Sequence, residues 1–240
     1  MYNKYTFFGI LVTVSILLAS CGGGKPNYKA PLKTDVDSAS YYFGYYYGVN
    51  FANSDFEDFN INAMAKGMQE ALKNGTDIDE QKMMEVQMYL NNFFMNLQTR
   101  SSDKTLKEGQ DFLENNRKKS GVVTLPSGLQ YKIIRDGSGV KPTIEDMVSL
   151  VYHGTLIDGS VFDSSKERGD TVLFPVGGVV LGFSEALTLM SEGSIWEVYI
   201  PAELGYGEST PDPQRIKPNS VLIFEIDMVK VNKQTDEDNY

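Results

Sequence analysis

Apolar residues in the first part of the chain recur at the spacing of a helix. Between residues 79 and 119 they stand at Met83, Val86, Leu90, Phe93 and Leu97, at intervals of three and four residues. The following polar segment, 98–105, indicates a helix that is packed at one end and solvated at the other. With capping residues and breakers, the same periodicity predicts three helices, over 37–53, 60–73 and 79–119.

The first predicted helix is aromatic around much of its circumference, because Tyr and Phe fill all of 41–48 except Gly44 and Gly48. A helix that is apolar on several sides is expected to be buried on several sides. The two glycines share one face and favour a close approach of another helix. Three helices alone bury too little surface, so the pattern predicts a helical homodimer. The methionines, six of ten of which lie in 64–95, fit either core packing or an adaptable surface that binds unfolded polypeptides.

From Gly121 onward the pattern changes to short apolar runs separated by Gly and Pro, which is typical of strands. The predicted strands cover 122–124, 129–134, 146–157, 160–163, 194–200 and 221–231, and 182–190 is predicted as the only helical stretch. An antiparallel sheet wrapped around one short helix gives an α+β domain.

The segment before the first predicted helix reads as a targeting signal. A cation, Lys4, precedes an apolar run over 7–19, which is shorter than the about 20 residues that span a bilayer. The run ends in Leu-Ala-Ser-Cys at 18–21, which resembles the lipobox of bacterial lipoproteins. This resemblance implies a signal peptide over 1–20 and a lipid anchor on Cys21; the alternative is an ordinary secretory signal. Gly22 after the cysteine resembles lipoproteins that are passed on to the outer membrane.

Composition excludes several kinds of chemistry. The chain has one Cys and one His among 240 residues, which excludes an internal disulfide framework, a Cys-rich zinc site, a Cys–His nucleophile and a His-based metal site. We therefore predict no metal and no cofactor. A formal net charge of −10 argues against nucleic acid as a partner.

Six motifs of the second half carry a resemblance to a known family. They are LPSGLQY at 125–131, VYHG at 151–154, DGSVFDSS at 158–165, VVLGF at 179–183, IPAELGYG at 200–207 and LIFE at 222–225. In this order they resemble the FKBP-type peptidyl-prolyl cis/trans isomerases. Over residues 37–231 the chain resembles the macrophage-infectivity-potentiator subfamily, in which a helical dimerisation domain precedes the isomerase domain.

The resemblance implies roles for individual residues. It implies a prolyl pocket with Phe183 as its floor, and substrate-binding residues Phe162, Val179, Val180, Ile216 and Phe224. It also implies that Tyr152, Asp163 and Tyr206 are catalytic: Tyr206 and the N–H of Val180 would donate to substrate carbonyls, while Asp163 would hold Tyr152 and face the twisted amide. Without the resemblance, the aromatic residues could equally be core and Asp163 a turn cap. Phe183 stands where the family commonly has Trp, and Val172 where some members have an aromatic wall, which puts tight macrolide binding in doubt.

The residue types fit this chemistry. Rotation about an X-Pro bond has a barrier of about 20 kcal/mol and needs no covalent step, so an apolar pocket that prefers the twisted amide suffices. We therefore predict a lipid-anchored isomerase of the cell envelope that acts on proline-containing, folding polypeptides. The alternatives are a holdase chaperone and a non-catalytic peptide-binding protein. The predicted parts are a signal peptide over 1–20, a tether over 21–36, a helical dimerisation domain over 37–120, an isomerase domain over 121–233 and an acidic tail over 234–240.

Overall fold

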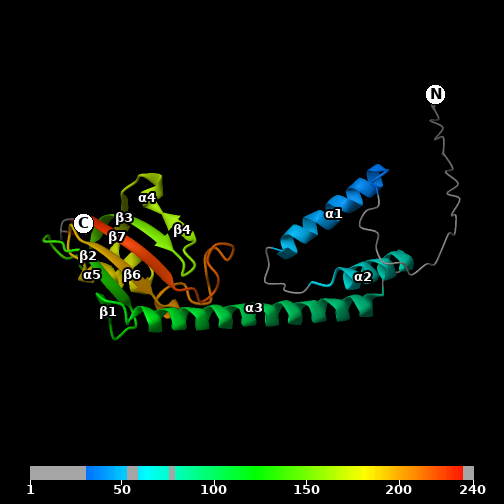
Figure 1. Cartoon of the computed structure of the whole chain (residues 1–240), viewed down its shortest axis with the longest axis horizontal. Helices are drawn as coiled ribbons and strands as arrows, with labels where there is room; N and C mark the ends of the chain where they lie inside the picture. The colour runs from blue at the N-terminus through cyan, green and yellow to red at the C-terminus, as the bar shows by residue number, and fades with distance from the viewer. Residues whose placement is uncertain (1–30, 53–58, 76–78, 235–240) are drawn as a thin grey trace, which may run out of the picture. The chain divides into compact units, whose positions relative to one another are not determined.

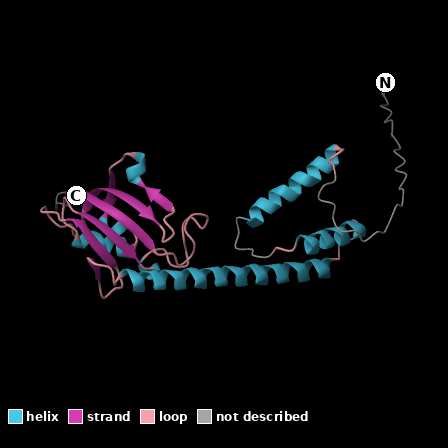
Figure 2. Ribbon diagram, viewed as in Figure 1, coloured by secondary structure: helices cyan, strands magenta, loops and turns pink. Residues whose placement is uncertain are grey.

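The computed structural model describes residues 31–52, 59–75 and 79–234. The predicted signal peptide, Cys21 and most of the predicted tether lie outside these residues, as does the acidic tail after residue 234. The chain divides into two units, one up to Asn50 and one from Phe51 onward, and each is described by itself. Figures 1 and 2 show the elements of both units.

The first helix, α1 (Asp35–Ala52), begins at a reciprocal cap. The hydroxyl of Thr34 accepts from the N–H of Asp37 (3.0 Å), and the Asp37 carboxylate accepts from the N–H of Thr34 (2.9 Å). No residue of α1 is buried, and Tyr42 and Phe43 are about two-thirds exposed, at 66% and 67%. The prediction that this aromatic surface is buried is therefore wrong for a single chain.

Two further helices follow, α2 (Ile61–Asn74) and α3 (Glu80–Asn116), each with a side-chain cap. Asn60 accepts from two N–H groups at the start of α2, and Asp79 accepts from the N–H of Lys82 at the start of α3. The 37 residues of α3 span about 55 Å, which confirms the single long helix that the periodicity predicts.

A seven-stranded antiparallel sheet forms the second half of the chain, with the strand order β1-β2-β6-β7-β3-β4 and β5 paired with β3. The strands are β1 (Val122–Thr124), β2 (Gln130–Arg135), β3 (Met147–Thr155), β4 (Val161–Ser164), β5 (Val172–Pro175), β6 (Ile195–Ile200) and β7 (Leu222–Asn232). One helix, α5 (Leu181–Leu189), packs into the core of this sheet, with Phe183, Ala186 and Leu187 buried. The predicted α+β architecture is confirmed (Figure 2).

Several short elements were not predicted. Besides α5, the part beyond residue 120 contains the four-residue helix α4 (Ser165–Arg168) and two 3₁₀ helices, Val176–Gly178 and Ala202–Leu204, so the prediction of a single helical stretch is wrong. Helix α4 forms because the Ser164 hydroxyl accepts from the N–H of Glu167 (3.1 Å). It ends at Gly169, whose φ of +73° suits a residue without a side chain.

The C-terminal part of α3 packs on the sheet. A Cβ atom on Gly109 would lie 2.8 Å from Cγ2 of Val221, so the helix comes close only because this residue is glycine. The buried Gln130 side chain of β2 donates to the backbone oxygen of Leu113 (3.0 Å) and accepts from the side chain of buried Asn116 (3.0 Å). These contacts fix the last two turns of α3 to the sheet. Among the described helices, none has the length and apolar character to span a bilayer.

Candidate active site

The candidate site is built where strands β3, β4 and β7 lie side by side. Gly154 of β3 pairs with Asp163 of β4 on one side and with Phe224 of β7 on the other. A Cβ atom on Gly154 would lie 2.8 Å from the Phe162 ring and 2.9 Å from the Phe224 ring. The missing side chain therefore allows the two rings to approach each other over the backbone of β3.

Phe224 is the centre of an aromatic cluster. Its ring centroid lies 4.8 Å from that of Phe183, 5.3 Å from Phe162 and 6.2 Å from Tyr152. The first two contacts are edge-to-face, which is a favourable geometry for aromatic pairs. Phe183 reaches the cluster from α5, and all four rings are buried. The cluster brings together, from four separate elements, the aromatic residues that the sequence predicts for the pocket.

Two valines and an isoleucine complete the apolar surroundings. Val179 and Val180 precede α5 and pack, half-buried, against the same core, while Ile216 is buried in it. The carbonyl of Val180 accepts from Phe183 and Ser184, but its N–H makes no hydrogen bond within the described part of the chain. This N–H is therefore available to a bound carbonyl group.

A hydrogen-bonded polar group borders the aromatic cluster. The hydroxyl of Tyr152 donates to the Asp163 carboxylate. Arg168 of α4 donates to the other oxygen of Asp163 (2.7 Å) and to the Tyr152 hydroxyl (3.2 Å). The prediction that Asp163 holds Tyr152 agrees with this geometry, and the side chain that caps α4 is that of Ser164.

These contacts set the protonation states of the polar group. Burial alone would raise the pKa of Asp163, but hydrogen bonds from Tyr152 and Arg168 outweigh it and lower the pKa below the ordinary value. Burial, and then the bond to Asp163, raise the pKa of Tyr152. At neutral pH the site therefore holds an ionised carboxylate and a neutral phenol.

Tyr206 follows the 3₁₀ helix Ala202–Leu204 and packs, half-buried, against the aromatic core. Burial, and then the negative charge of Asp163, raise the pKa of Tyr206. Its hydroxyl consequently remains protonated at neutral pH and can donate a hydrogen bond.

Two residues of this arrangement were not predicted from the sequence. Arg168 lies five residues after Asp163, and the capping pattern Ser-x-x-Glu at 164–167 could have indicated a helix that returns it toward the site. Phe174 of β5 lies 5.8 Å, centroid to centroid, from Tyr152. The only Trp of the chain, Trp196, packs against Tyr131 in a stacked pair with ring centroids 4.3 Å apart.

In the ranges that the structure describes, no three His, Cys, Asp or Glu side chains form a group that could hold a metal ion. The aromatic cluster and its borders are apolar apart from the Tyr152, Asp163, Arg168 and Tyr206 side chains. The groups that this site presents to a ligand are thus buried rings and hydrogen-bonding side chains.

Comparison with known proteins gives a consistent result. Residues 138–229 match the family model described as FKBP-type peptidyl-prolyl cis-trans isomerase, and residues 36–133 match the domain amino terminal to such isomerases. The chain is 42% identical to the outer membrane protein MIP of Legionella longbeachae, over 93% of this chain and 97% of that protein. It is 36% identical to the peptidyl-prolyl cis-trans isomerase Mip of Coxiella burnetii, over 85% and 90% of the two chains. Its structure is similar to the crystal structure of FkpA from Escherichia coli, with a TM-score of 0.67 and 27% identity over 84% and 99% of the two chains.

Proposed function

The chain belongs to the FKBP-type peptidyl-prolyl cis-trans isomerases, and we propose that it isomerises X-Pro bonds in the aromatic cluster around Phe224. The observation that carries the proposal is the convergence of Tyr152, Phe162, Phe183 and Phe224 beside the polar group of Asp163. The holdase and non-catalytic alternatives are not favoured, because relatives over most of the chain are isomerases by name.

The geometry supports a mechanism based on differential binding. An X-Pro amide loses conjugation as it twists, and the twisted form is less well solvated by water than the planar form is. The buried rings take the proline side chain, with Phe183 as the floor and Val179 and Ile216 at the borders. The N–H of Val180 and the hydroxyl of Tyr206 donate to carbonyls of the bound chain, which fixes its orientation. The ionised Asp163 faces the carbon of the twisted carbonyl, where it stabilises the transition state more than either planar isomer.

The test is the turnover of a short X-Pro peptide by the full processed chain. We expect Asp163→Asn to lower kcat/KM about tenfold and Tyr206→Phe about three- to tenfold, in line with the loss of one charged and one neutral hydrogen-bond partner. Asp103→Asn and Tyr89→Phe make the same chemical changes on exposed positions of α3 and serve as controls. An unmodified chain without turnover, or site variants as active as the controls, would refute the proposed site.

We further propose that the enzyme is attached to the cell envelope by lipid on Cys21 and assists the folding of exported, proline-containing polypeptides. The supporting observations are the lipobox-like sequence at 18–21 and the similarity to a relative named as an outer membrane protein. Several acyl chains are needed for stable attachment, because one chain alone binds a membrane only marginally. Mass spectrometry of the membrane-extracted protein checks this, and an unmodified Cys21 thiol would refute it.

We also propose a homodimer formed through the N-terminal helices. The exposed aromatic surface of α1 supports this, because monomeric proteins rarely leave so many large rings in solvent on one element. The glycines support it as well: Cβ atoms on Gly44 and Gly48 would meet nothing within 4 Å in the single chain. A second copy would both cover the rings and use the close approach that the glycines permit.

A further inference from the structure

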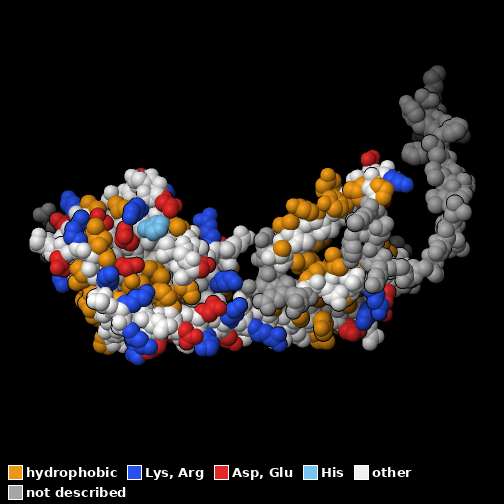
Figure 3. Space-filling view, in the orientation of Figure 1, with side chains coloured by type: hydrophobic (Ala, Val, Ile, Leu, Met, Phe, Trp, Pro, Cys, Tyr) orange, Lys and Arg blue, Asp and Glu red, His pale blue; other side chains and the backbone are white. Residues whose placement is uncertain are grey.

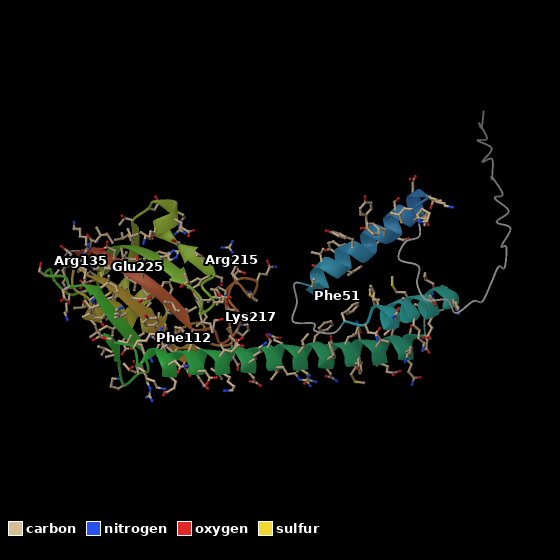
Figure 4. The ribbon with its side chains drawn as sticks, viewed as in Figure 1. Phe51, Phe112, Arg135, Arg215, Lys217 and Glu225 are labelled. Atoms are coloured by element: carbon tan, nitrogen blue, oxygen red, sulfur yellow. The ribbon has the colours of Figure 1, made fainter. Side chains whose placement is uncertain are left out.

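A groove of about 1170 Å³ lies between α3 and two loops of the isomerase part, outside the aromatic cluster. One wall is the face of α3 that carries Phe93, Leu97, Arg100 and Lys104. The opposite wall comes from the turn between β3 and β4 and from the loop before β7. Figure 4 shows Arg215 and Lys217 projecting from that loop.

The charges of the groove differ from those of the whole chain. Four cationic side chains line it against two acidic ones, although the chain has a formal net charge of −10. The charged lining residues are Arg100, Lys104, Arg215, Lys217, Glu108 and Asp158. On the face shown in Figure 3, Lys and Arg side chains stand among Asp and Glu side chains where the isomerase part meets α3. The groove is therefore a cationic region on an acidic protein.

The cations of α3 are available to a ligand. Arg100 and Lys104 stand one turn apart, are exposed, and make no side-chain hydrogen bond or ion pair with any residue that the structure describes. Asp158, by contrast, already accepts hydrogen bonds from the N–H (2.9 Å) and hydroxyl (2.6 Å) of Ser160. Among the described residues, Arg215 makes one ion pair, an exposed contact of 3.5 Å with Asp212. Arg100 and Lys104 are thus the cations of the groove that a ligand can pair with.

The groove shares its walls with the aromatic cluster. Val161 of β4 lines the groove, while the next residue, Phe162, contacts Phe224 in the cluster. In the loop before β7, Arg215 and Lys217 line the groove while Ile216 between them is buried in the aromatic core. The same two segments therefore contribute side chains to both places, and a substrate that reaches from the cluster to the groove has to pass around them.

We propose that this groove binds an acidic segment of the substrate polypeptide that flanks the isomerised X-Pro bond. The proposal rests on the proposed isomerisation site. Carboxylates of the segment pair with Arg100, Lys104 and Arg215, and its apolar side chains lie on Leu97, Leu156 and Val161. The groove thereby selects among proline-containing substrates that the aromatic cluster alone does not distinguish.

The experiment compares five substrates with the full processed chain. One is a short X-Pro peptide, and the other four are the same peptide extended by about eight residues, rich either in Asp or in Ser, before or after the proline. For the extension on one side of the proline, we expect kcat/KM for the Asp-rich peptide to exceed that for the Ser-rich peptide about three- to tenfold at low salt. Two or three exposed ion pairs would give a difference of this size. The ratio should fall toward one at about 0.5 M salt, because exposed charges are screened.

Variants locate the effect. The double variant Arg100→Gln with Lys104→Gln should bring the ratio of kcat/KM for the Asp-rich to the Ser-rich peptide close to one. The control is Lys107→Gln with Lys118→Gln, which removes two cations that do not line the groove and should leave this ratio unchanged. A wild-type ratio of one, or equal loss in both double variants, would overturn the proposal. If the short peptide itself is not turned over, the isomerisation site is refuted instead.

A membrane surface also presents anionic groups, so binding to lipid is measured in a separate experiment. The chain without acyl groups is sedimented with vesicles of three parts phosphatidylcholine and one part phosphatidylglycerol. Binding that depends on Arg100 and Lys104, together with an Asp-to-Ser ratio of one, would assign the groove to lipid and overturn the peptide proposal. Absence of such binding with a raised ratio supports the peptide.

Discussion

Arg168 joins the two polar residues of the site, since it donates to both Asp163 and the Tyr152 hydroxyl. Its guanidinium also lies 6.0 Å from the centre of the Tyr152 ring. With a fork of donors on one planar group, an arginine can hold a carboxylate and a phenol at once, which a lysine does less well. The residue therefore acts as a positioning residue for the carboxylate.

Replacing Arg168 by Leu should change the pH dependence of turnover. The pKa of Asp163 is lowered in the folded protein, so the carboxylate stays ionised until the pH falls below its ordinary range. Without the guanidinium, one of the contacts that lower the pKa of Asp163 is lost, so this pKa rises. The acid limb of the pH profile of kcat/KM should therefore move to higher pH. At neutral pH we expect a loss of about three- to tenfold, with partial recovery in Arg168→Lys.

Rate measurements on a short X-Pro peptide from pH 4 to 9 check this shift. Arg135→Leu is a matched control, because Arg135 pairs with Asp227 on an exposed part of the sheet (Figure 4). A loss by the same factor at every pH in this range would show that Arg168 acts on folding and not on Asp163.

A second carboxylate, Asp146, ties the C-terminal end of the sheet to the loop before β3. It is 3% exposed and accepts from Lys233 (2.7 Å), from the N–H of Gln234 (3.0 Å) and from Thr143. Burial would raise its pKa, but these bonds prevail and hold the pKa far below the ordinary value of 3.8. Its contribution to stability is therefore present above about pH 4 and is lost as the pH falls through the lowered pKa.

Asp146→Asn should lower the free energy of unfolding at pH 7 by about 1–3 kcal/mol, because an amide cannot accept all of these bonds. The variant should also lose less stability than the wild type between pH 5 and pH 2. Urea unfolding at several pH values measures both effects, with Asp103→Asn on exposed α3 as the control. Parallel pH curves for wild type and Asp146→Asn would contradict the assignment.

At the level of elements, the sequence predicts best where a long period and a cap coincide. The apolar repeat from Met83 to Leu97 predicts α3 to within one residue of its beginning and three residues of its end. The four-residue elements β5 and α4 are too short for a period to appear. The contact between Asn116 and Gln130 was beyond prediction, because it depends on how a helix docks on a strand.

For the candidate site, too, local patterns could be predicted and contacts between distant segments could not. The aromatic residues and Asp163 could be named because they stand in motifs that resemble a family, while their convergence depends on the pairing of β3 with both β4 and β7. Arg168 was missed because its role comes from the position of α4 and not from a pattern of its own. Local chemistry was thus readable from the sequence, and contacts between distant segments were not.

The docking of α3 on the sheet can be tested at Gly109. Gly109→Leu places a side chain where Val221 already lies, and should lower the free energy of unfolding by about 1–3 kcal/mol. Hydrogen exchange in the last turns of α3 should become faster. Gln110→Leu, on an exposed neighbouring position, controls for the added apolar residue, and Val221→Ala should relieve part of the loss. Equal stability of the two leucine variants would contradict the packing.

For the whole molecule, the exposed aromatic residues of α1 predict assembly into a homodimer. We expect sedimentation of the processed chain at micromolar concentration to give the mass of two chains, and Phe43→Glu with Tyr46→Glu to give one. Turnover of a short X-Pro peptide should persist in this variant, because the proposed site lies wholly within residues 152–224. Val140→Glu changes an exposed apolar residue of the isomerase part and should leave the dimer intact. A wild-type mass of one chain would refute the assembly.

Helix α3 carries the cationic wall of the groove and the contact with Val221 on one continuous helix. Each residue of an α-helix turns the chain through about 100° and advances it by about 1.5 Å. Two residues inserted between Lys104 and Gly109 would therefore lengthen the helix by only about 3 Å but rotate Arg100 and Lys104 by about 200°, away from the groove. Seven inserted residues would lengthen it by about 10 Å and return the same side chains to within about 20° of their original direction. The angular phase of this helix, more than its length, determines whether its cations face the substrate.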